Sequence, residues 1–346
     1  MFKTNPGNSS AVKFTSVCIE SIGVTLPPEI ISSNEIERRL APTYERLRLP
    51  EGRLELMSGI AQRRLWAPGT PIRTPSIESG LTALQNSAIR PEDIGCLVHG
   101  SVCRDYLEPA TACSVHAGLG LSPDCWVHDM SNACLGLLSG AVQIAGLIES
   151  GAIKAGIVVG TENSRSLLEA TIASLNADES LTRQSIKPHF ASLTIGSGSC
   201  AILLCHESLS QRNNRLQAAV ARAECEHNDL CQSDTDQAGT QMQPLMQTDS
   251  EQLLHAGVGV GQRTFESLLS EGYSRDSFAS TVCHQVGGTH RKMMLESIGM
   301  PEERDFSTFK WLGNTGSVAL PTALAIALDH KAIAPGDTCA LLGIGS

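Results

Sequence analysis

The sequence predicts an α/β protein built from two similar halves. Short apolar runs alternate with longer segments rich in alanine and leucine, which is the order expected of a sheet covered by helices. A strand–turn–helix–strand unit also occurs twice: a turn at Cys134 opens a buried helix that leads to GAIKAGIVVG, and a turn near Ser317 opens another that leads to IAPGDTCALLG. Superposing Gly160 on Gly343 places Cys134 near Ser317, so the repeat indicates a duplicated unit.

The first half should alternate strands with helices. A helix over 74–90 leads through a Pro-Glu-Asp turn into an apolar strand, and a helix from Pro109 has proline at its first position, where no N–H donor is needed. The helix from Cys134 to Glu149 is apolar on every side, so we expect it to be wholly buried. The expected strands of this half are Ile94–His99, Cys125–Asp129, Ala155–Gly160 and one that follows a glycine-containing turn within 193–206.

The second half follows a polar, Gln/Asn-rich stretch over 207–250, which predicts a crossover with a long surface loop. The expected helices beyond it cover 250–271, 288–298 and 318–328, and the expected strands end at Val282, lie near 308–311 and close the chain at 338–342. We therefore divide the chain into an N-terminal half, 1–206, and a C-terminal half, 207–346.

Composition limits the possible functions. Twenty-six basic and thirty-six acidic residues give a net charge of −10, which argues against a nucleic-acid partner. We find no apolar run of the ~18 residues that a membrane span needs, and the segment MFKTNPGNSSAVKF has no apolar core of a secretory signal. Twelve cysteines without a CxxC pair predict reduced thiols, a cytoplasmic location and no metal site.

A local cluster of arginines has two interpretations that the sequence leaves open. It could hold an anionic cofactor, or it could be an ordinary solvated face of the protein. Its members are Arg38, Arg39, Arg46, Arg48, Arg63 and Arg64.

Three polar residues stand at predicted strand-to-helix turns. Cys134 opens the buried helix, where backbone N–H groups and the helix dipole converge, so we expect a lowered thiol pKa and a nucleophile. His284 follows a β-branched strand, at the end where α/β sheets place ligands, and Asn314 lies in the turn GNTG. Each has an ordinary interpretation as well: a core cysteine, a structural histidine and a turn former.

Taken together, these motifs resemble the thiolase superfamily, and in particular condensing enzymes similar to ketoacyl-acyl-carrier-protein synthase III. The resemblance rests on SNACLG at 131–136, HQVGG at 284–288, GNTGSVALP at 313–321 and the terminal LLGIGS, with SGIAQRRLW at 58–66 and LTIGSGSCAILL at 193–204 in support. SVCRDYLEPAT at 101–111 together with NACLG looks most like the olefin-biosynthesis, OleA-type enzymes, which condense two fatty acyl-coenzyme A molecules.

The resemblance implies a duplicated five-layer αβαβα fold, a homodimer and a ping-pong reaction. Cys134 would carry the acyl group as a thioester, and His284 and Asn314 would donate hydrogen bonds to the second thioester as it becomes an enolate. The N–H groups of Cys134 and of the Gly345–Ser346 segment would form the other oxyanion hole. Acyl-CoA or acyl-carrier-protein thioesters enter as substrates, so no cofactor is expected.

Glu108 is the candidate base that a non-decarboxylating condensation needs to remove an α-proton. It resembles the glutamate of the OleA-type RDYLEP motif, which reaches across the dimer into the neighbouring site. The alternative is that Glu108 is merely an acidic residue in the first turn of a helix.

The sequence departs from the synthase pattern in three places. RLELMSGI lacks the Trp and Arg that hold the adenine of coenzyme A in synthase III enzymes, so the residues that bind the nucleotide stay unknown. HQVGG lacks the asparagine seen after HQA. The similar enzymes continue past GIGS into a last strand, so either a buried sheet edge stays unpaired here or the sequence is a shortened one, and both alternatives bear on the Gly345–Ser346 oxyanion hole.

Two other functions stay open at this point. One is a synthase III-like condensation with a malonyl thioester, or acyl transfer to an oxygen or nitrogen acceptor. The other is a non-catalytic partner that binds acyl chains, as chain-length factors do. Such partners generally lose the nucleophile, whereas Cys134, His284 and Asn314 are all present here.

Overall fold

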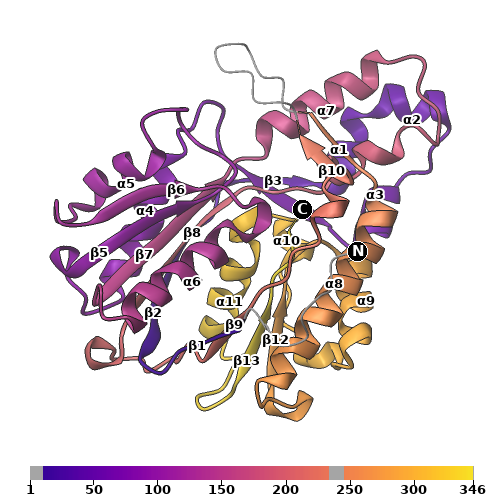
Figure 1. Ribbon diagram of the computed structural model, residues 1–346. Coiled ribbons are helices and arrows are strands. Elements are labelled where there is room, and N and C mark those ends of the chain that lie inside the picture. The colour runs from indigo at the N-terminus through magenta and orange to yellow at the C-terminus, as the bar shows by residue number, and fades with distance from the viewer. Residues whose placement is uncertain (1–10, 234–244, 346) are drawn as a thin grey trace.

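Five layers of helices and strands make up the chain in the computed structural model, which describes residues 11–233 and 245–345 (Figure 1). A five-stranded sheet and the pair β12–β13 form the two β layers. Helices form the other three: α4 (Arg73–Gln85) and α5 (Thr111–Leu119) outside the large sheet, α6 (Gly136–Glu149) and α11 (Ala319–Asp329) between the β layers, and α8 (Ser250–Ser270) and α9 (Gly288–Ile298) on the far side. The expected αβαβα fold class is confirmed.

The large sheet combines parallel and antiparallel strands. Its strand order is β2 (Val17–Thr25), β8 (Gly198–His206), β7 (Ala155–Glu162), β5 (Ile94–Gly100) and β6 (Trp126–Met130). The central strand β5 runs parallel to both β6 and β7, while β8 is antiparallel to β7 and β2. Because β5, β6 and β7 run in one direction, their carboxyl ends meet at one edge, and the residues that follow them gather there.

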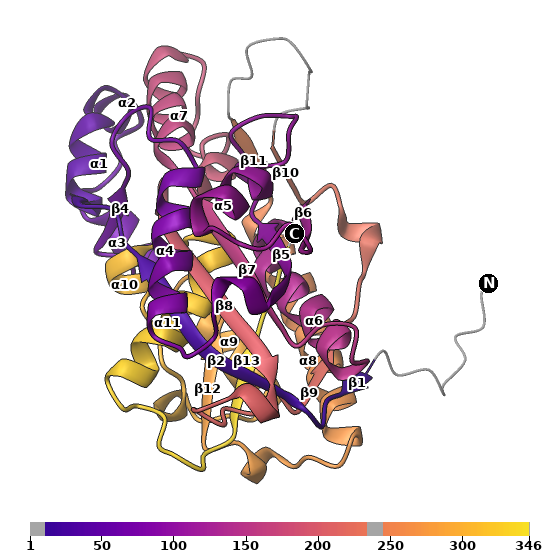
Figure 2. The same cartoon turned by 90° about the vertical axis from the view of Figure 1, so that its left-hand side faces the viewer.

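Two apolar clusters hold this sheet between its helix layers. On one face, side chains of β5, β7 and β8 pack against α4 and α5, which cover that face in Figure 2. On the other face they pack against α6. All eight residues of β7 are buried, as expected for a strand covered on both sides. Gly100 and Gly136 touch here, since a Cβ on Gly136 would lie 2.7 Å from the Gly100 carbonyl oxygen. This close approach fixes the start of α6 against β5.

The second half repeats the core of the first. β12 (Ser280–Cys283) and β13 (Cys339–Leu342) are parallel, and α11 packs on them from the inner side. A short 3₁₀ turn precedes each inner helix: Ala133–Leu135 before α6 and Gly316–Val318 before α11. Cys134 and Ser317 are the central residues of these turns, and the turns pack against each other. The predicted repeat is therefore confirmed.

Several expected elements differ from the structure. The segment expected as a strand near 308–311 is the short helix α10 (Phe309–Leu312), and α5 begins at Thr111 rather than at Pro109. Within 207–250, residues 234–244 lie outside the described residues. The rest of that stretch contains β9 (Ala218–Val220), β10 (Cys231–Ser233) and β11 (Met246–Thr248), and many of its residues line a cavity rather than a free surface.

Before residue 74 no helix or strand was predicted. The structure has β1 (Ala11–Lys13), β2, β3 (Glu29–Ser32), α1 (Ser33–Arg39), α2 (Ala41–Leu47), α3 (Arg53–Ser58) and β4 (Gln62–Leu65) there. Helices α1 and α2 pack with α7 (Arg165–Ala177) into a separate apolar cluster. Of the helices in 11–233 and 245–345, none combines the length and the hydropathy that crossing a bilayer requires.

Candidate active site

Cys134 lies in a strained turn between β6 and α6. The residue before it, Ala133, has φ +42°, in the left-handed region that a residue with a Cβ rarely adopts. On its other side, α6 begins at Gly136 against β5. The side chain of Asn132 also anchors this turn, because its Nδ2 donates to Ser139 Oγ at 2.8 Å. Strained backbone that packing holds in place is typical of a functional position.

The expected lowered pKa of Cys134 is wrong. Burial raises the pKa of its thiol to about 12, and the nearby Glu162 carboxylate and Cys231 add to the rise. The hydrogen bond from the backbone N–H of Cys134 lowers the thiol pKa, but its effect is smaller than those of burial, Glu162 and Cys231. The thiol is therefore protonated at neutral pH, and a neighbouring base is needed before it can attack a substrate.

His284 directly follows β12, as predicted. Its backbone N–H donates to the Leu342 carbonyl at 2.9 Å, which ties it to the end of β13. The imidazole is 3% exposed, and its Nε2 has no hydrogen-bond partner among the described residues. Burial, with a smaller contribution from His290, lowers the pKa of His284 to about 3, so the ring is neutral at physiological pH. A neutral ring can accept a proton from a thiol or donate a hydrogen bond to a carbonyl oxygen.

The side chain of Asn314 is held by the turn that opens α11. Its Oδ1 accepts the N–H of Gly316 at 3.0 Å, and its backbone pairs with Ile195 before β8. Because Oδ1 is occupied, the Nδ2 group is the part of the amide that remains to donate a hydrogen bond to a ligand.

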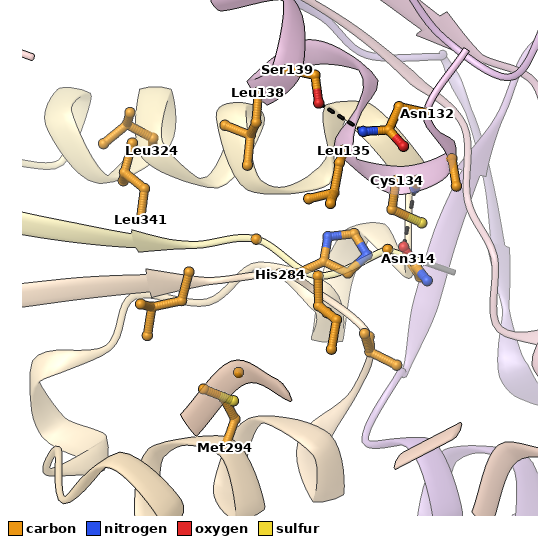
Figure 3. Close-up of a pocket in the computed structure, with 18 of the residues that line it drawn as sticks. Asn132, Cys134, Leu135, Leu138, Ser139, His284, Met294, Asn314, Leu324 and Leu341 are labelled. Atoms are coloured by element: carbon orange, nitrogen blue, oxygen red, sulfur yellow. Dashed lines mark hydrogen bonds between the residues drawn. The ribbon is translucent and has the colours of Figure 1, made fainter. Parts of the chain in front are cut away.

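Cys134, His284 and Asn314 meet in one cavity, although they come from opposite halves of the chain. All three line it, and Figure 3 shows their side chains beside one another, with the Cys134 thiol next to the Asn314 amide. Apolar side chains form the adjoining walls: Leu135, Leu138, Met294, Leu324 and Leu341. A thiol, a neutral imidazole and a carboxamide beside an apolar wall suit an acyl thioester with a hydrocarbon chain.

Glu162, at the end of β7, is a member of the site that the sequence analysis missed. It lines the same cavity and is 7% exposed. Its Oε1 accepts hydrogen bonds from Ser317 Oγ and from the N–H of Val102. Burial raises the pKa of this carboxyl group. Glu162 stands at the end of a buried strand, and His284 was identified by the same kind of position. Glu162 could therefore have been found from the sequence.

Glu108 does not belong to this chain's own cavity. It is exposed, in the loop over 101–110 between β5 and α5, and it does not line the cavity. The loop is held at its middle and at its C-terminal end: the Asp105 carboxylate accepts the Ile72 N–H at 2.6 Å, and the Asp129 carboxylate accepts the N–H of Thr111, the first residue of α5, at 2.8 Å. The loop therefore presents Glu108 outward, away from Cys134 of the same chain.

The terminal segment approaches the nucleophile turn. Gly345 lines the cavity, and a Cβ at this position would lie 3.5 Å from the backbone nitrogen of Leu135. Ser346 lies outside the described residues, so the oxyanion hole expected from Gly345–Ser346 stays a prediction.

The arginine cluster does not converge on a ligand site. Arg63 is fully buried and donates to Ser33 Oγ and to the Leu193 carbonyl, both at 3.0 Å. Four others also have partners within the protein: Arg38 and Arg39 pair with Glu35, Arg46 donates to the carbonyls of Leu175 and Asp178, and Arg64 donates to that of Pro27. Arg48 is the left-handed residue that ends α2. These partners favour the structural interpretation of the cluster over a cofactor site.

Comparison with known proteins places this geometry among condensing enzymes. Residues 268–346 match the family described as 3-oxoacyl-[acyl-carrier-protein (ACP)] synthase III C terminal. The acyl-CoA:acyl-CoA alkyltransferase of Shewanella oneidensis is 39% identical over 97% of each chain. The protein of the same name from Xanthomonas campestris is 32% identical over 96% of each chain.

Solved structures of Xanthomonas campestris OleA share the fold over nearly the whole chain. A cysteine-to-serine variant with bound lauric acid and lauroyl-CoA matches with a TM-score of 0.89 at 31% identity, covering 96% of each chain. Variants of the same protein in which a glutamate or a histidine is replaced match with TM-scores of 0.90 and 0.89.

Proposed function

We propose that this chain condenses two fatty acyl-CoA thioesters in a Claisen reaction, because it belongs to the OleA-type acyl-CoA:acyl-CoA alkyltransferases of the thiolase superfamily. The observation that carries the proposal is the meeting of Cys134, His284 and Asn314 in one cavity with apolar walls. The chain is thus an acyltransferase, and its expected product is a β-keto acid or the corresponding β-ketoacyl thioester.

In the first half-reaction, we propose that Cys134 takes the acyl group. His284, neutral and beside the thiol, accepts its proton as Sγ attacks the carbonyl carbon of the first acyl-CoA. The bond from that carbon to the coenzyme A sulfur breaks, and coenzyme A leaves with the proton. The result is a neutral acyl thioester, which a buried apolar site holds more easily than a charged thiolate.

In the second half-reaction, His284 and Asn314 act on another acyl-CoA. Both offer N–H donors toward its thioester oxygen, where negative charge develops when the α-proton is removed. The resulting carbanion attacks the acyl carbon on Cys134, the bond from that carbon to Sγ breaks, and the thiolate of Cys134 is protonated again. One carbon–carbon bond is made, and hydrolysis of the product thioester gives the β-keto acid.

We assign removal of the α-proton to Glu108 of a second subunit in a homodimer. The support is the edge of the large sheet, where β6 pairs with β5 alone among the described strands. Large apolar side chains are exposed on this strand and on the neighbouring loop: Trp126, Val102, Tyr106 and Leu107. An exposed sheet edge beside apolar side chains is suited to pairing with another copy of the chain.

Placing a charge on this edge should dissociate the dimer. Trp126, 64% exposed on β6, would be buried between subunits, so Trp126→Asp should produce monomers in sedimentation velocity. If Glu108 acts across the interface, these monomers should still load Cys134 but lose condensation. Trp311→Asp is the matched control, because Trp311 is 53% exposed on α10, away from the edge. A wild-type chain that sediments as a monomer with full activity would contradict both the dimer and the trans role.

The alternative, condensation with a malonyl thioester as in synthase III enzymes, predicts different products from one simple experiment. Incubated with myristoyl-CoA alone, the chain should release free coenzyme A and form a β-keto acid of two myristoyl chains, seen by thiol titration and mass spectrometry. If no product forms until malonyl-CoA is added, and if the new carbons come from the malonyl group, the acyl-CoA:acyl-CoA reaction is refuted. Acyl transfer to an oxygen or nitrogen acceptor would likewise require an added acceptor.

We also propose that the chain works in the cytoplasm. All twelve cysteines are free thiols, as expected in a reducing compartment.

A further inference from the structure

His290, in the first turn of α9, is a buried histidine that the proposed reaction does not use. It is only 8% exposed, and neither of its ring nitrogens has a hydrogen-bond partner among the residues that the structure describes. A buried polar atom without a partner costs about as much free energy as a lost hydrogen bond, so native proteins contain few of them. Two such atoms on one ring therefore point to a polar ligand group.

His290 belongs to the wall of the candidate active site. His290 lines the cavity together with Cys134 and His284, and it is close enough to His284 to contribute to that residue's lowered pKa. Met294 follows one helical turn later on the same face of α9. Figure 3 shows the Met294 side chain on the cavity wall beyond His284. His290 thus lies on the stretch of wall between His284 and Met294.

The cavity reaches the surface near the start of α9. Met57 and Ser58 at the end of α3 line the cavity, and Met57 is 47% exposed. Helix α9 begins directly against them, because a Cβ at Gly287 would lie 2.8 Å from the carbonyl oxygen of Ser58. A thioester with its reacting carbon at Cys134 and its carrier outside the protein can therefore extend along the start of α9, past His290.

The chemistry of the ring matches one part of such a substrate. Burial lowers the pKa of His290 to about 4, so the ring is neutral at physiological pH, with one N–H donor and one nitrogen acceptor. A secondary amide offers the complementary acceptor and donor in its carbonyl oxygen and N–H. A hydrocarbon acyl chain offers neither, whereas the pantetheine arm of coenzyme A and of carrier proteins contains secondary amides.

We propose that His290 is a substrate-binding residue that hydrogen-bonds a secondary amide in the pantetheine arm of the acyl thioester. This assignment rests on the proposed function, because it assumes that a thioester reaches Cys134 through this cavity. His290 touches the arm and not the reacting atoms. It selects donors that carry the arm over other thioesters of the same acyl group.

The test compares three donors with the same acyl group and different arms. Decanoyl-CoA carries the full arm, decanoyl-N-acetylcysteamine carries one amide, and S-butyl decanethioate carries none. The rate of Cys134 acylation is followed by intact-protein mass spectrometry in the wild type and in His290→Leu. We expect acylation by decanoyl-CoA to fall about 10-fold in the variant, with acylation by the butyl thioester changing less than about 2-fold.

Two further variants separate binding from a structural role. His290→Gln keeps a donor and an acceptor, so it should recover most of the acylation rate with decanoyl-CoA. Met294→Leu, on the same face of α9, should change the rates with all three donors equally. Thermal unfolding of His290→Leu should begin no lower than that of the wild type, since the substitution removes two unpartnered buried nitrogens. If this variant does not fold, His290→Met takes its place in the comparison.

Equal losses with all three donors would overturn the proposal. So would a loss that appears with 3-hydroxydecanoyl-CoA, added as a fourth donor, and not with decanoyl-CoA, since this would place the imidazole beside the acyl chain. Decanoyl-CoA and decanoyl-acyl carrier protein should respond alike to His290→Leu, because both carry the same arm. Acylation is measured without condensation, so a wild type that loads normally but makes no β-keto product would refute the Claisen reaction and leave the assignment of His290 intact.

Discussion

Replacing Cys134 by serine or alanine is expected to abolish acyl loading and to reduce product formation by about 10⁴-fold or more, the usual consequence of removing a nucleophile. After incubation with myristoyl-CoA, the wild-type chain should gain the mass of one myristoyl group, and peptide mapping should place it on Cys134. The variants should gain none. The strained turn at Ala133 and the position of the thiol beside Asn314 and His284 are the features that single out this cysteine among twelve.

Cys103→Ser is the matched control for this experiment. Cys103 lines the same cavity, and burial raises the pKa of its thiol well above the usual range. The substitution should leave loading nearly unchanged, because the Cys103 sulfur hydrogen-bonds the backbone of Asn163 and does not lie in a turn that opens an inner helix. An acyl group found on Cys103 or Cys283 while Cys134 stays free would show that the nucleophile was assigned wrongly.

The raised pKa of Cys134 also predicts how the reactivity of its thiol depends on pH. With a folded-state pKa of about 12, the thiolate fraction rises about 10-fold per pH unit between pH 7 and 9. The rate at which iodoacetamide alkylates Cys134 in the absence of substrate should therefore increase over this range without reaching a plateau. A plateau below pH 8 would indicate that His284 already holds the proton in the free protein.

The positions of the candidate site residues could be predicted from the sequence better than their protonation states. Cys134, His284 and Asn314 could be found from the sequence because each follows a strand or opens an inner helix, and parallel strands bring such positions together. The direction of the Cys134 pKa shift could not be found, because it depends on how much water the fold excludes and on Glu162, which is 28 residues away in sequence. Electrostatic environment is a property of packing, and local sequence does not contain it.

One element that was not predicted and one that was misassigned have equally specific causes. The apolar pattern of β2 is interrupted by Glu20, which is 2% exposed and is satisfied by Ser210 Oγ and the N–H of Gln211 on a distant loop. Phe309–Leu312 is rich in aromatic residues that favour a strand, but the side chain of Gln285 accepts the N–H groups of Thr308 and Phe309 and starts a helix there. In both cases a tertiary hydrogen bond overrides the local preference.

Glu108→Gln should separate the two half-reactions. The substitution preserves the size of the side chain and much of its hydrogen bonding, but it removes the basicity that an α-proton abstraction requires. Loading of Cys134 should be unaffected, because that step uses Cys134 and His284. Condensation of two acyl-CoAs should fall by about 10²–10⁴-fold, so the acyl-enzyme should accumulate in intact-mass spectra. Glu78→Gln, at an exposed glutamate on α4, should change neither step.

Mixed dimers then decide which chain supplies the base. In a dimer of one Cys134→Ser chain and one Glu108→Gln chain, a base that acts across the interface gives one complete site: the thiol of the Glu108→Gln chain with the glutamate of its partner. Co-purified heterodimers should therefore recover up to about half of the wild-type activity, while either homodimer stays inactive. A base that acts within its own chain would leave the heterodimer inactive as well. Because Glu108 is exposed and lies outside its own chain's cavity, recovery is the expected result, and near-normal condensation by the Glu108→Gln homodimer would rule out Glu108 as the base altogether.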